Sequence, residues 1–257
     1  MHPLLERQFS LTGKVALVTG GSKGLGKAMA RGLAAAGADL VLAARHEEQL
    51  QRTADELRRE TGRTVHVVTA DLSRREQTER LAEEALRAAG RIDILVNNAG
   101  TNVPQPIQAI DNQTWDQIVE LNLSSIMALS RALAPGMIER RWGRIIHISS
   151  IMGFISAPGR DVYSATKSGL LGLTRAMAID LGPHGITVNC IAPGPFLTDL
   201  PMSLLSKEQQ EEFAKRTALG RWGRPDELIG TVVLLASEAG CYITGTTIVV
   251  DGGWLAK

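Results

Sequence analysis

Short apolar runs, rich in β-branched residues, alternate along the chain with longer stretches in which apolar positions recur every three or four residues. The short runs predict buried strands, and the longer stretches predict helices with one apolar face. The predicted strands are residues 15–19, 40–44, 65–70, 92–97, 144–149, 186–191 and 246–250. The predicted helices are one that ends at residue 36 and others over residues 47–60, 74–89, 115–140 and 162–181.

This alternation predicts an α/β protein with a doubly wound, seven-stranded parallel sheet and helices on both faces. No linker, repeat or change in composition divides the chain, so we expect a single domain over residues 1–257. Pro135 is expected to kink or end the helix in which it lies. Residues 195–219, which include Pro201 and a polar stretch at 206–212, interrupt the alternation, and we expect them to form a helical flap over the site.

The charge balance argues against several classes of partner. Lys and Arg number 28, Asp and Glu 27, and no basic block indicates a nucleic-acid-binding surface. The densest basic cluster, at residues 140–144, is expected to be a solvated turn. No apolar run is long enough to span a bilayer, and the first residues lack the apolar core of a signal peptide. We therefore expect a cytoplasmic protein with a small-molecule substrate and no nucleic-acid or membrane partner.

The two cysteines, Cys190 and Cys241, lie far apart in the sequence and form no CxxC pair. This spacing predicts neither a disulfide framework nor a zinc site. We expect two free thiols in a reducing compartment, and no metal site.

A glycine-rich turn follows the first predicted strand and opens a helix. Its residues after Thr19 are Gly20, Gly21, Ser22, Lys23, Gly24, Leu25 and Gly26. Glycines at such a place let the backbone approach a pyrophosphate, and the helix N-terminus offers N–H groups and a positive dipole end. Glycine-rich turns also occur for steric reasons alone, but the position after the first strand favours a nucleotide.

The end of the second predicted strand bears on the choice of coenzyme. An NAD site usually has an acidic residue there, for the ribose 2′-hydroxyl. This chain has Arg45 at that point, and a guanidinium can bind a 2′-phosphate with two parallel hydrogen bonds. Lys23 adds a second cation in the glycine turn. The pair predicts a preference for NADP(H), with NAD(H) as a possible alternative coenzyme, although both residues are also ordinary surface charges on a simpler interpretation.

Tyr163 and Lys167 are four residues apart in a predicted helix, so they share a face. A tyrosine with a pKa of about 10 is a poor base at neutral pH. A neighbouring ammonium stabilises the phenolate, and we expect Lys167 to lower the pKa of Tyr163 in this way.

These motifs together resemble the short-chain dehydrogenase/reductase family, in which Thr-Gly-x-x-x-Gly-x-Gly is followed by a serine and a Tyr-x-x-x-Lys motif. The resemblance implies a Rossmann domain in which Ser150, Tyr163, Lys167 and Asn122 are catalytic. Ser150 lies thirteen residues before Tyr163, which favours it over Ser149. Asn122 is implied to hold a water beside the lysine, although a helix amide bonded to backbone is the simpler interpretation.

The same resemblance extends almost from end to end. It implies coenzyme contacts from Tyr163 and Lys167, which are placed at the nicotinamide ribose, and from residues at the ends of later strands, namely Asp71, Leu72, Asn98, Ala99, Gly100, Pro193, Gly194 and Thr198. Asp71 equally suits a cap for the next helix. A frequent asparagine is replaced here by His147. The resemblance also implies a homotetramer, with contacts from helices in the middle of the chain and from the C-terminal strand.

The substrate is predicted only by class: an alcohol or ketone that exchanges a hydride with the nicotinamide. Two groups within the family look similar, the gluconate 5-dehydrogenases with other sugar dehydrogenases, and the 3-oxoacyl-(acyl-carrier-protein) reductases; the first is favoured. Arg160, three residues before Tyr163, is a candidate anchor for a substrate carboxylate or a plain surface charge. The alternative to an enzyme is a non-catalytic NADP-binding sensor or scaffold with the same fold. Candidate substrate-lining residues are Asn102, Val103, Ile151, Met152, Phe196, Leu197 and Met202.

Overall fold

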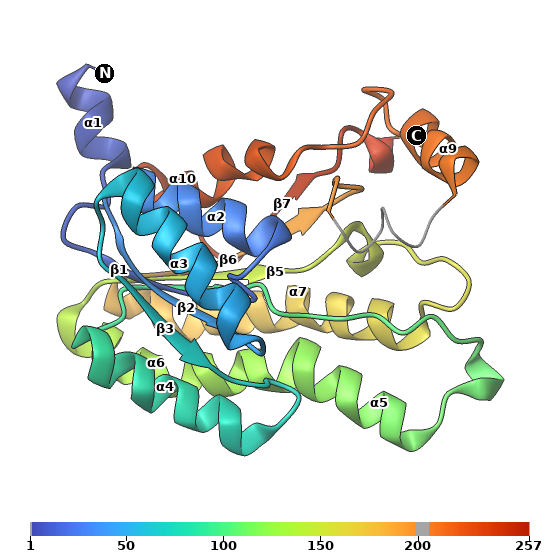
Figure 1. The fold of residues 1–257 in the computed structure, drawn as a ribbon, viewed down its shortest axis with the longest axis horizontal. Coiled ribbons are helices and arrows are strands. Elements are labelled where there is room, and N and C mark those ends of the chain that lie inside the picture. The colour runs from blue at the N-terminus through green and yellow to red at the C-terminus, as the bar shows by residue number, and fades with distance from the viewer. Residues whose placement is uncertain (1, 199–205, 257) are drawn as a thin grey trace.

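The seven strands among the described residues form one parallel sheet in the order β3-β2-β1-β4-β5-β6-β7 (Figure 1). A computed structural model describes residues 2–198 and 206–256, so Pro201 and Met202 of the predicted flap lie outside the described residues. The strands are β1 (Val15–Thr19), β2 (Asp39–Ala44), β3 (Val65–Thr69), β4 (Ile94–Asn97), β5 (Gly143–Ile148), β6 (Ile186–Pro193) and β7 (Thr247–Val250). The predicted doubly wound α/β fold is confirmed.

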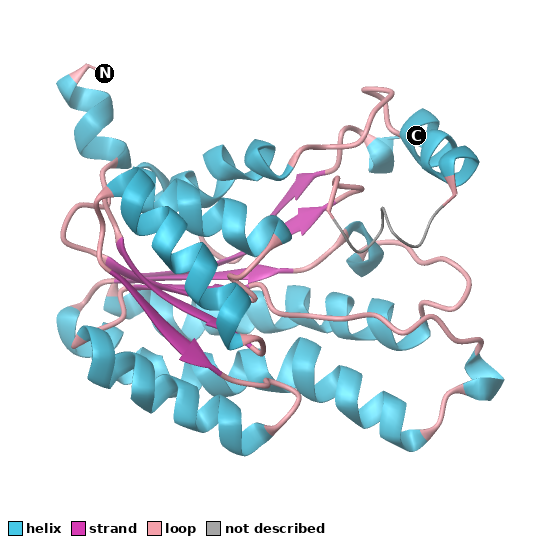
Figure 2. Ribbon diagram, viewed as in Figure 1, coloured by secondary structure: helices cyan, strands magenta, loops and turns pink. Residues whose placement is uncertain are grey.

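Helices cover both faces of this sheet (Figure 2). The α-helices are α1 (Pro3–Phe9), α2 (Gly24–Ala35), α3 (Glu47–Thr61), α4 (Arg75–Ala89), α5 (Asn112–Val119), α6 (Ser125–Arg140), α7 (Asp161–Leu181), α9 (Lys207–Arg216) and α10 (Ile229–Ala236). The 3₁₀ turns are Ile107–Ala109, Ile151–Gly153, Gly182–His184, Pro225–Leu228, Glu238–Gly240 and Trp254–Ala256. No helix within residues 2–198 and 206–256 has the length and apolar character that a membrane crossing requires.

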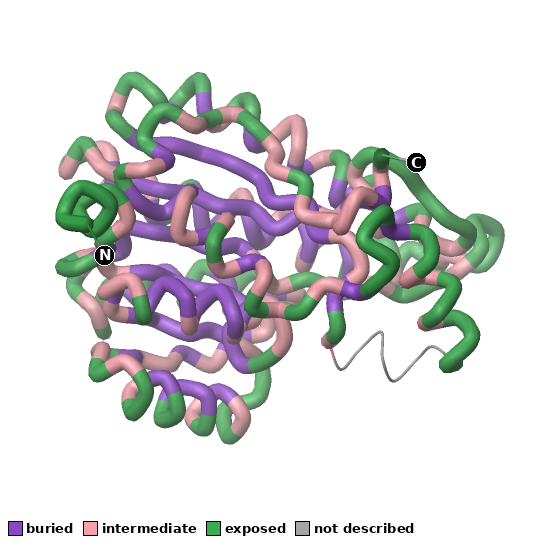
Figure 3. The backbone as a smooth tube through the Cα atoms, turned by 90° about the horizontal axis from the view of Figure 1, so that it is seen from above, coloured by how far each residue is buried: buried purple, intermediate pink, exposed green. Residues whose placement is uncertain are grey.

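Two apolar cores lie on opposite faces of the sheet. One packs α2, α3 and α10 against it, through residues such as Met29, Leu50 and Val232. The other packs α4, α6 and α7, through residues such as Leu81 and Leu129. Figure 3 shows buried strands at the centre and exposed outer helix surfaces. Burial on both faces explains why the strands are continuous apolar runs rather than alternating ones.

The order of the strands reverses between β1 and β4, since β2 and β3 lie on one side of β1 and the later strands on the other. Ligands of open α/β sheets bind at the carboxyl ends of the strands beside such a switch point. The glycine turn after β1 and the loop after β4 therefore border the expected ligand site.

Three features differ from the sequence-based expectation. Helices α1 and α10 were not predicted. The predicted helix over residues 115–140 is two helices, α5 and α6, joined by a π-helical turn at Glu120–Ser124. Pro135 lies inside α6, which continues to Arg140, so of the two expectations for Pro135, a kink or an end of the helix, the end is wrong.

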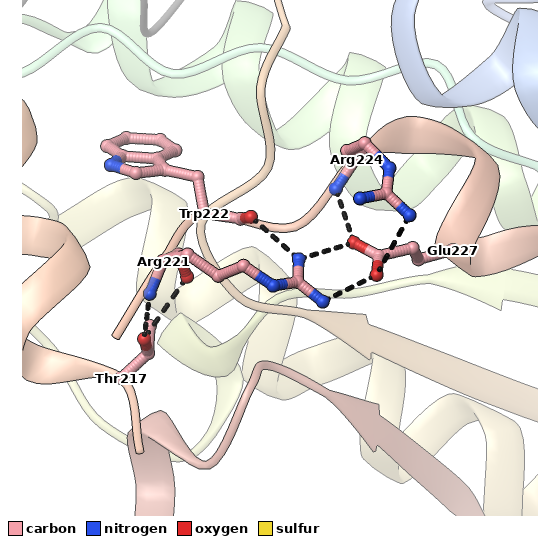
Figure 4. Close-up of polar contacts among 5 residues, drawn as sticks. All are labelled: Thr217, Arg221, Trp222, Arg224 and Glu227. Carbon is pink, nitrogen blue, oxygen red and sulfur yellow. Dashed lines mark hydrogen bonds and ion pairs between the residues drawn. The ribbon is translucent and has the colours of Figure 1, made fainter. Parts of the chain in front are cut away.

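Two backbone hydrogen bonds join the start of the predicted flap to Gly223, which follows the flap, and we call this contact of Pro195, Leu197 and Gly223 the neck. Leu197 N–H donates to the Gly223 carbonyl at 2.8 Å, and Gly223 N–H donates to the Pro195 carbonyl at 3.0 Å. The Arg221 guanidinium forms two hydrogen bonds, of 2.8 and 2.7 Å, with the two carboxylate oxygens of Glu227 (Figure 4). Glu227 also accepts from the Arg224 backbone N–H at 2.7 Å, so the neck is fastened to the start of α10.

Candidate active site

Close contacts within the protein require glycines at two positions of the turn after β1. Gly20 adopts φ of +64°, in the left-handed region that favours glycine. A Cβ added at Gly26 would lie 2.2 Å from the Gly20 carbonyl oxygen, a distance that no side chain tolerates. The turn therefore closes on itself and leaves its backbone N–H groups near the start of α2, as a phosphate cradle requires.

Asn98, at the end of β4, locks this turn to the sheet. Its amide donates to the carbonyl oxygens of Thr19 and Gly20, at 2.9 and 3.3 Å. The Thr19 hydroxyl in turn accepts from the backbone N–H groups of Asn98 and Ala99, both at 3.0 Å. This network holds the ends of β1 and β4 together at the switch point.

A pocket of about 370 Å³ opens beside the turn. The predicted coenzyme residues that line it are Gly20, Ser22, Lys23, Gly24, Leu25, Gly26, Arg45, Leu72, Asn98, Ala99, Gly100 and Thr198. Seven further residues line the pocket and were not predicted: Ala43, Ala44, His46, Gln49, Ala70, Thr101 and Leu121. Most of these flank a predicted residue in the sequence. Gln49 has no such signal, and it reaches the pocket wall through a hydrogen bond from the Ser22 hydroxyl at 3.2 Å.

The two predicted cations, Lys23 and Arg45, both lie at this pocket. Arg45 and Lys23 both line it and are exposed. Arg45 also acts on Asp71: burial tends to raise the pKa of Asp71, but hydrogen bonds from Ser73 and the charges of Arg45 and Arg74 outweigh it and lower the pKa. Positive charge therefore gathers where β2 and β3 end.

Five predicted coenzyme residues do not line this pocket: Asp71, Tyr163, Lys167, Pro193 and Gly194. Asp71 accepts from the backbone N–H and the hydroxyl of Ser73 in a local turn, and the residue that caps α4 is Arg74, so the alternative of a helix cap is wrong. Gly194 packs against the strand end opposite, where an added Cβ would lie 2.6 Å from the Asp251 Cα.

The two candidate serines at the end of β5 have different surroundings. Ser149 is buried, and its hydroxyl donates to the Lys167 carbonyl at 2.8 Å. Ser150 is half-buried, its hydroxyl accepts from the Met152 N–H at 3.1 Å, and it also hydrogen-bonds the Tyr163 phenol. The Ser149 hydroxyl is therefore hydrogen-bonded to the backbone of α7, whereas the Ser150 hydroxyl is hydrogen-bonded to the Tyr163 phenol.

Tyr163 and Lys167 face the same side of α7, with the Lys167 Nζ 5.6 Å from the centroid of the Tyr163 ring. Burial raises the pKa of Tyr163, and the hydrogen bond with Ser150 and the charge of Arg160 oppose this only in part. Burial also lowers the pKa of Lys167 to about 8.

The expectation that Lys167 lowers the pKa of Tyr163 is therefore wrong for the protein without coenzyme. The Lys167 ammonium donates to the Ile148 carbonyl at 2.7 Å, rather than to the phenol. At neutral pH the phenol is protonated, which is the state required to donate a proton to a carbonyl oxygen.

Asn122 lies in the π-helical turn and is fully buried. Its side chain bonds the backbone N–H and carbonyl of Thr101, at 2.9 and 2.8 Å. A Cβ added at Gly100 would lie 3.2 Å from the Asn122 Oδ1 and 3.4 Å from the Lys167 Nζ. Asn122 and Lys167 thus flank Gly100, which lines the pocket, and the loop after β4 is fastened between them.

A row of buried side chains crosses the neighbouring strands β4, β5 and β6. The strand register places Asn97 beside His147, and His147 beside Cys190. The Asn97 amide nitrogen lies 3.1 Å from the His147 Nδ1, and the His147 Nε2 and Asn97 Oδ1 are buried with no hydrogen-bond partner among the described residues. Burial, helped by the charge of Lys167, lowers the pKa of His147 to about 3, so this imidazole is neutral.

The described residues contain no group of three or more His, Cys, Asp or Glu side chains arranged to hold a metal ion. Cys190 and Cys241 are both free thiols, the first buried and the second exposed.

A doubly wound parallel sheet with a glycine turn at its switch point is the architecture of dinucleotide-binding proteins. The family description "short chain dehydrogenase" matches residues 14–209. The chain belongs to this family, whose members are oxidoreductases that use NAD(P) and act on CH–OH groups.

Similar proteins include sugar-acid dehydrogenases and 3-oxoacyl-(acyl-carrier-protein) reductases. The chain is 42% identical to a 2-dehydro-3-deoxy-D-gluconate 5-dehydrogenase of Escherichia coli, over 97% of this chain and 98% of that protein. It is 37% identical to a 3-oxoacyl-(acyl-carrier-protein) reductase of Aquifex aeolicus, over 96% of this chain and 99% of that protein. A gluconate 5-dehydrogenase from Burkholderia cenocepacia, crystallised with NADP and tartrate, superposes with a TM-score of 0.92 at 37% identity, covering 98% of this chain and 99% of that one.

Proposed function

We propose that this protein is an NADP(H)-dependent oxidoreductase that interconverts a hydroxyl and a carbonyl group on a sugar acid, in the manner of a gluconate 5-dehydrogenase. The observation that carries the proposal is the Tyr163 phenol, which hydrogen-bonds Ser150 and lies above the Lys167 ammonium. Lys167 is also next to Gly100, which lines the pocket. An acid, a hydrogen-bond donor and a cation therefore lie together, and the cation is next to a residue of the pocket wall.

The residues of the pocket fit a dinucleotide coenzyme. The turn at Gly20–Gly26 forms a cradle that a Cβ at Gly26 would fill, and the start of α2 lies behind it. Arg45 and Lys23 suit a 2′-phosphate, which favours NADP(H) over NAD(H). Several similar structures, including the Burkholderia enzyme, were crystallised with NADP, which supports the same choice.

When bound, the coenzyme supplies or accepts the hydride. The chain's own residues then handle the oxygen of the substrate. Ser150 donates a hydrogen bond to it, and Tyr163 gives or takes its proton. Lys167 holds positive charge beneath the phenol, and Asn122 keeps the loop after β4 against Lys167. Placement and electrostatics are the contributions expected of the protein in such a reaction.

The choice of a sugar acid rests on the Escherichia coli and Burkholderia relatives. A 3-oxoacyl-(acyl-carrier-protein) reductase is the second candidate, since the Aquifex relative covers as much of the chain. Four exposed apolar side chains in the loops after β4, β5 and β6 favour it, because they suit an acyl chain: Val103, Phe154, Ile155 and Leu197.

We further propose a single-domain, cytoplasmic homotetramer in which residues 195–219 form a flap beside the site. Exposed apolar side chains on α5, on α7 and near β7 support assembly, because a second copy would cover them; they include Trp115, Ile179 and Tyr242. Two free cysteines suit a reducing compartment.

The test is turnover of D-gluconate with NADP⁺ or NAD⁺, and of acetoacetyl thioesters with the reduced coenzymes, by the purified protein and its Tyr163→Phe variant. We expect the variant to lose at least about 100-fold in kcat, since acid–base catalysis contributes 10²–10⁴-fold, and to retain NADPH binding. Tyr242→Phe is the matched control, because Tyr242 is the other of the chain's two tyrosines and is fully exposed. Full activity of Tyr163→Phe, or no binding of NADPH by the wild type, would contradict the proposal.

A further inference from the structure

An arginine without a partner lies at the start of the helix that carries Tyr163. Arg160 immediately precedes α7, and its side chain makes no capping bond to the helix. It is half-buried, and within residues 2–198 and 206–256 its guanidinium has no ion pair or hydrogen bond. Partial burial of an unpaired guanidinium costs free energy, and an anion that bound it would recover part of that cost.

Arg160 is close to the reacting phenol. The two residues are three positions apart at the first turn of α7, which places them on the same face. Their proximity is also electrostatic, because the charge of Arg160 acts to lower the pKa of Tyr163. A group that Arg160 binds would therefore lie within a few bonds of an oxygen that Tyr163 protonates.

The backbone at Arg160 is held from two sides. Its N–H donates to the Ala157 carbonyl at 3.1 Å, and the Gly159 carbonyl accepts from the Gln105 N–H at 3.3 Å. A Cβ at Gly159 would lie 3.3 Å from the Gln105 nitrogen, so the two loops are in contact. The backbone of Arg160 is thus fixed between the loop after β4 and the start of α7.

We propose that Arg160 binds the carboxylate of the substrate and so makes the protein selective for hydroxy acids over neutral polyols. This proposal rests on the function proposed above. A guanidinium offers two parallel N–H donors that match the two oxygens of a carboxylate. Binding at that end fixes the orientation of the chain of carbons, so that one particular hydroxyl reaches Ser150 and Tyr163.

The test compares two substrates that differ at one terminal carbon. D-Gluconate carries a carboxylate where D-glucitol carries a CH₂OH group, and their other hydroxyls are the same. We expect the wild type to favour gluconate in kcat/KM, and Arg160→Gln to reduce this preference by about 10- to 100-fold, the range expected for hydrogen bonds to a charged group. The loss should lie mainly in KM for gluconate, with turnover of glucitol little changed.

Two further variants sharpen the result. Arg160→Lys keeps the charge but not the paired donors, so it should lose part of the preference. Arg175→Gln is the matched control, because Arg175 is an exposed arginine further along the same helix, and it should behave as the wild type does. Thermal melting checks that each variant is folded.

Equal losses on gluconate and glucitol in Arg160→Gln would overturn the assignment, because Arg160 would then act through the pKa of Tyr163. An unchanged preference would overturn it as well. Absence of gluconate turnover by the wild type is a separate outcome: it removes the proposed function, and the role of Arg160 with it.

Discussion

The buried imidazole of His147 makes a quantitative prediction about acid stability. His147 is fully buried between Asn97 and Cys190, and its pKa is lowered to about 3 from an ordinary value of 6.5. Because the folded pKa lies below the unfolded one, the unfolded chain binds more protons between these two values. The free energy of unfolding should therefore decrease as the pH falls from 6.5 towards 3.

The size of the effect follows from the two pKa values. Between pH 7 and pH 5, the unfolded histidine gains most of a proton while the folded one gains almost none. Linkage then gives a loss of about 2 kcal/mol from His147 alone. This figure changes little for any folded pKa well below 5, so it depends on burial of the imidazole rather than on the exact value.

The perturbation is His147→Asn, which keeps a hydrogen-bonding side chain beside Asn97. Urea unfolding of both proteins at pH 7 and pH 5, at one protein concentration and one ionic strength, gives the pH dependence of each. The wild type should lose about 2 kcal/mol more than the variant over this interval. The other four histidines and Lys167 are common to both proteins and cancel in the difference. Equal pH dependence in the two proteins would refute the reasoning, since it would mean that His147 titrates normally in the folded state.

Two further pairs of substitutions test the site. Arg45→Asp should lower the ratio of kcat/KM for NADP⁺ to kcat/KM for NAD⁺ by about 100-fold, because the 2′-phosphate loses a bidentate partner and faces a carboxylate instead. Arg52→Asp, on the exposed face of α3, is the control. An unchanged ratio in Arg45→Asp would exclude the role given to Arg45. Ser150→Ala should reduce kcat about 100-fold at an unchanged melting temperature, whereas Ser149→Ala should chiefly cost stability, about 1 kcal/mol for the lost bond to Lys167. The reverse pattern would move the catalytic assignment to Ser149.

Most of the sheet was predictable because its strands are buried on both faces and are bounded by glycines. Strand β1 and helix α7 were placed to within one residue. The π-helical turn at Glu120–Ser124 was not predicted, since such turns are rare and the one extra residue shifts the later apolar positions by only one place. Helix α10 was also missed: its sequence, Ile229–Ala236, is apolar on every side, so it lacks the amphipathic period by which a helix is recognised.

The candidate site, like the fold, could be predicted only in part from the sequence. Glycines and charges predicted the pocket wall, because a turn or a phosphate requires particular residue types at particular places. The choice between Ser149 and Ser150 was predicted by spacing, and their different hydrogen-bond partners appear only in three dimensions. The sign of the Tyr163 pKa shift was mispredicted, because sequence spacing brings an ammonium near the phenol but does not reveal how deeply the phenol is buried or that Ile148 binds the ammonium.

The neck formed by Pro195, Leu197 and Gly223 has a consequence for how such proteins diversify. The chain leaves β6 and passes through a pair of backbone hydrogen bonds to Gly223, beside the ion pair of Arg221 with Glu227. The described part of the segment between these points is also held by C-terminal residues, because the Phe213 ring centroid lies 5.4 Å from that of Trp254 and the Leu219 N–H donates to the Gly252 carbonyl at 3.1 Å. A segment exchanged between relatives to transplant substrate preference would therefore have to carry its matching C-terminal residues with it.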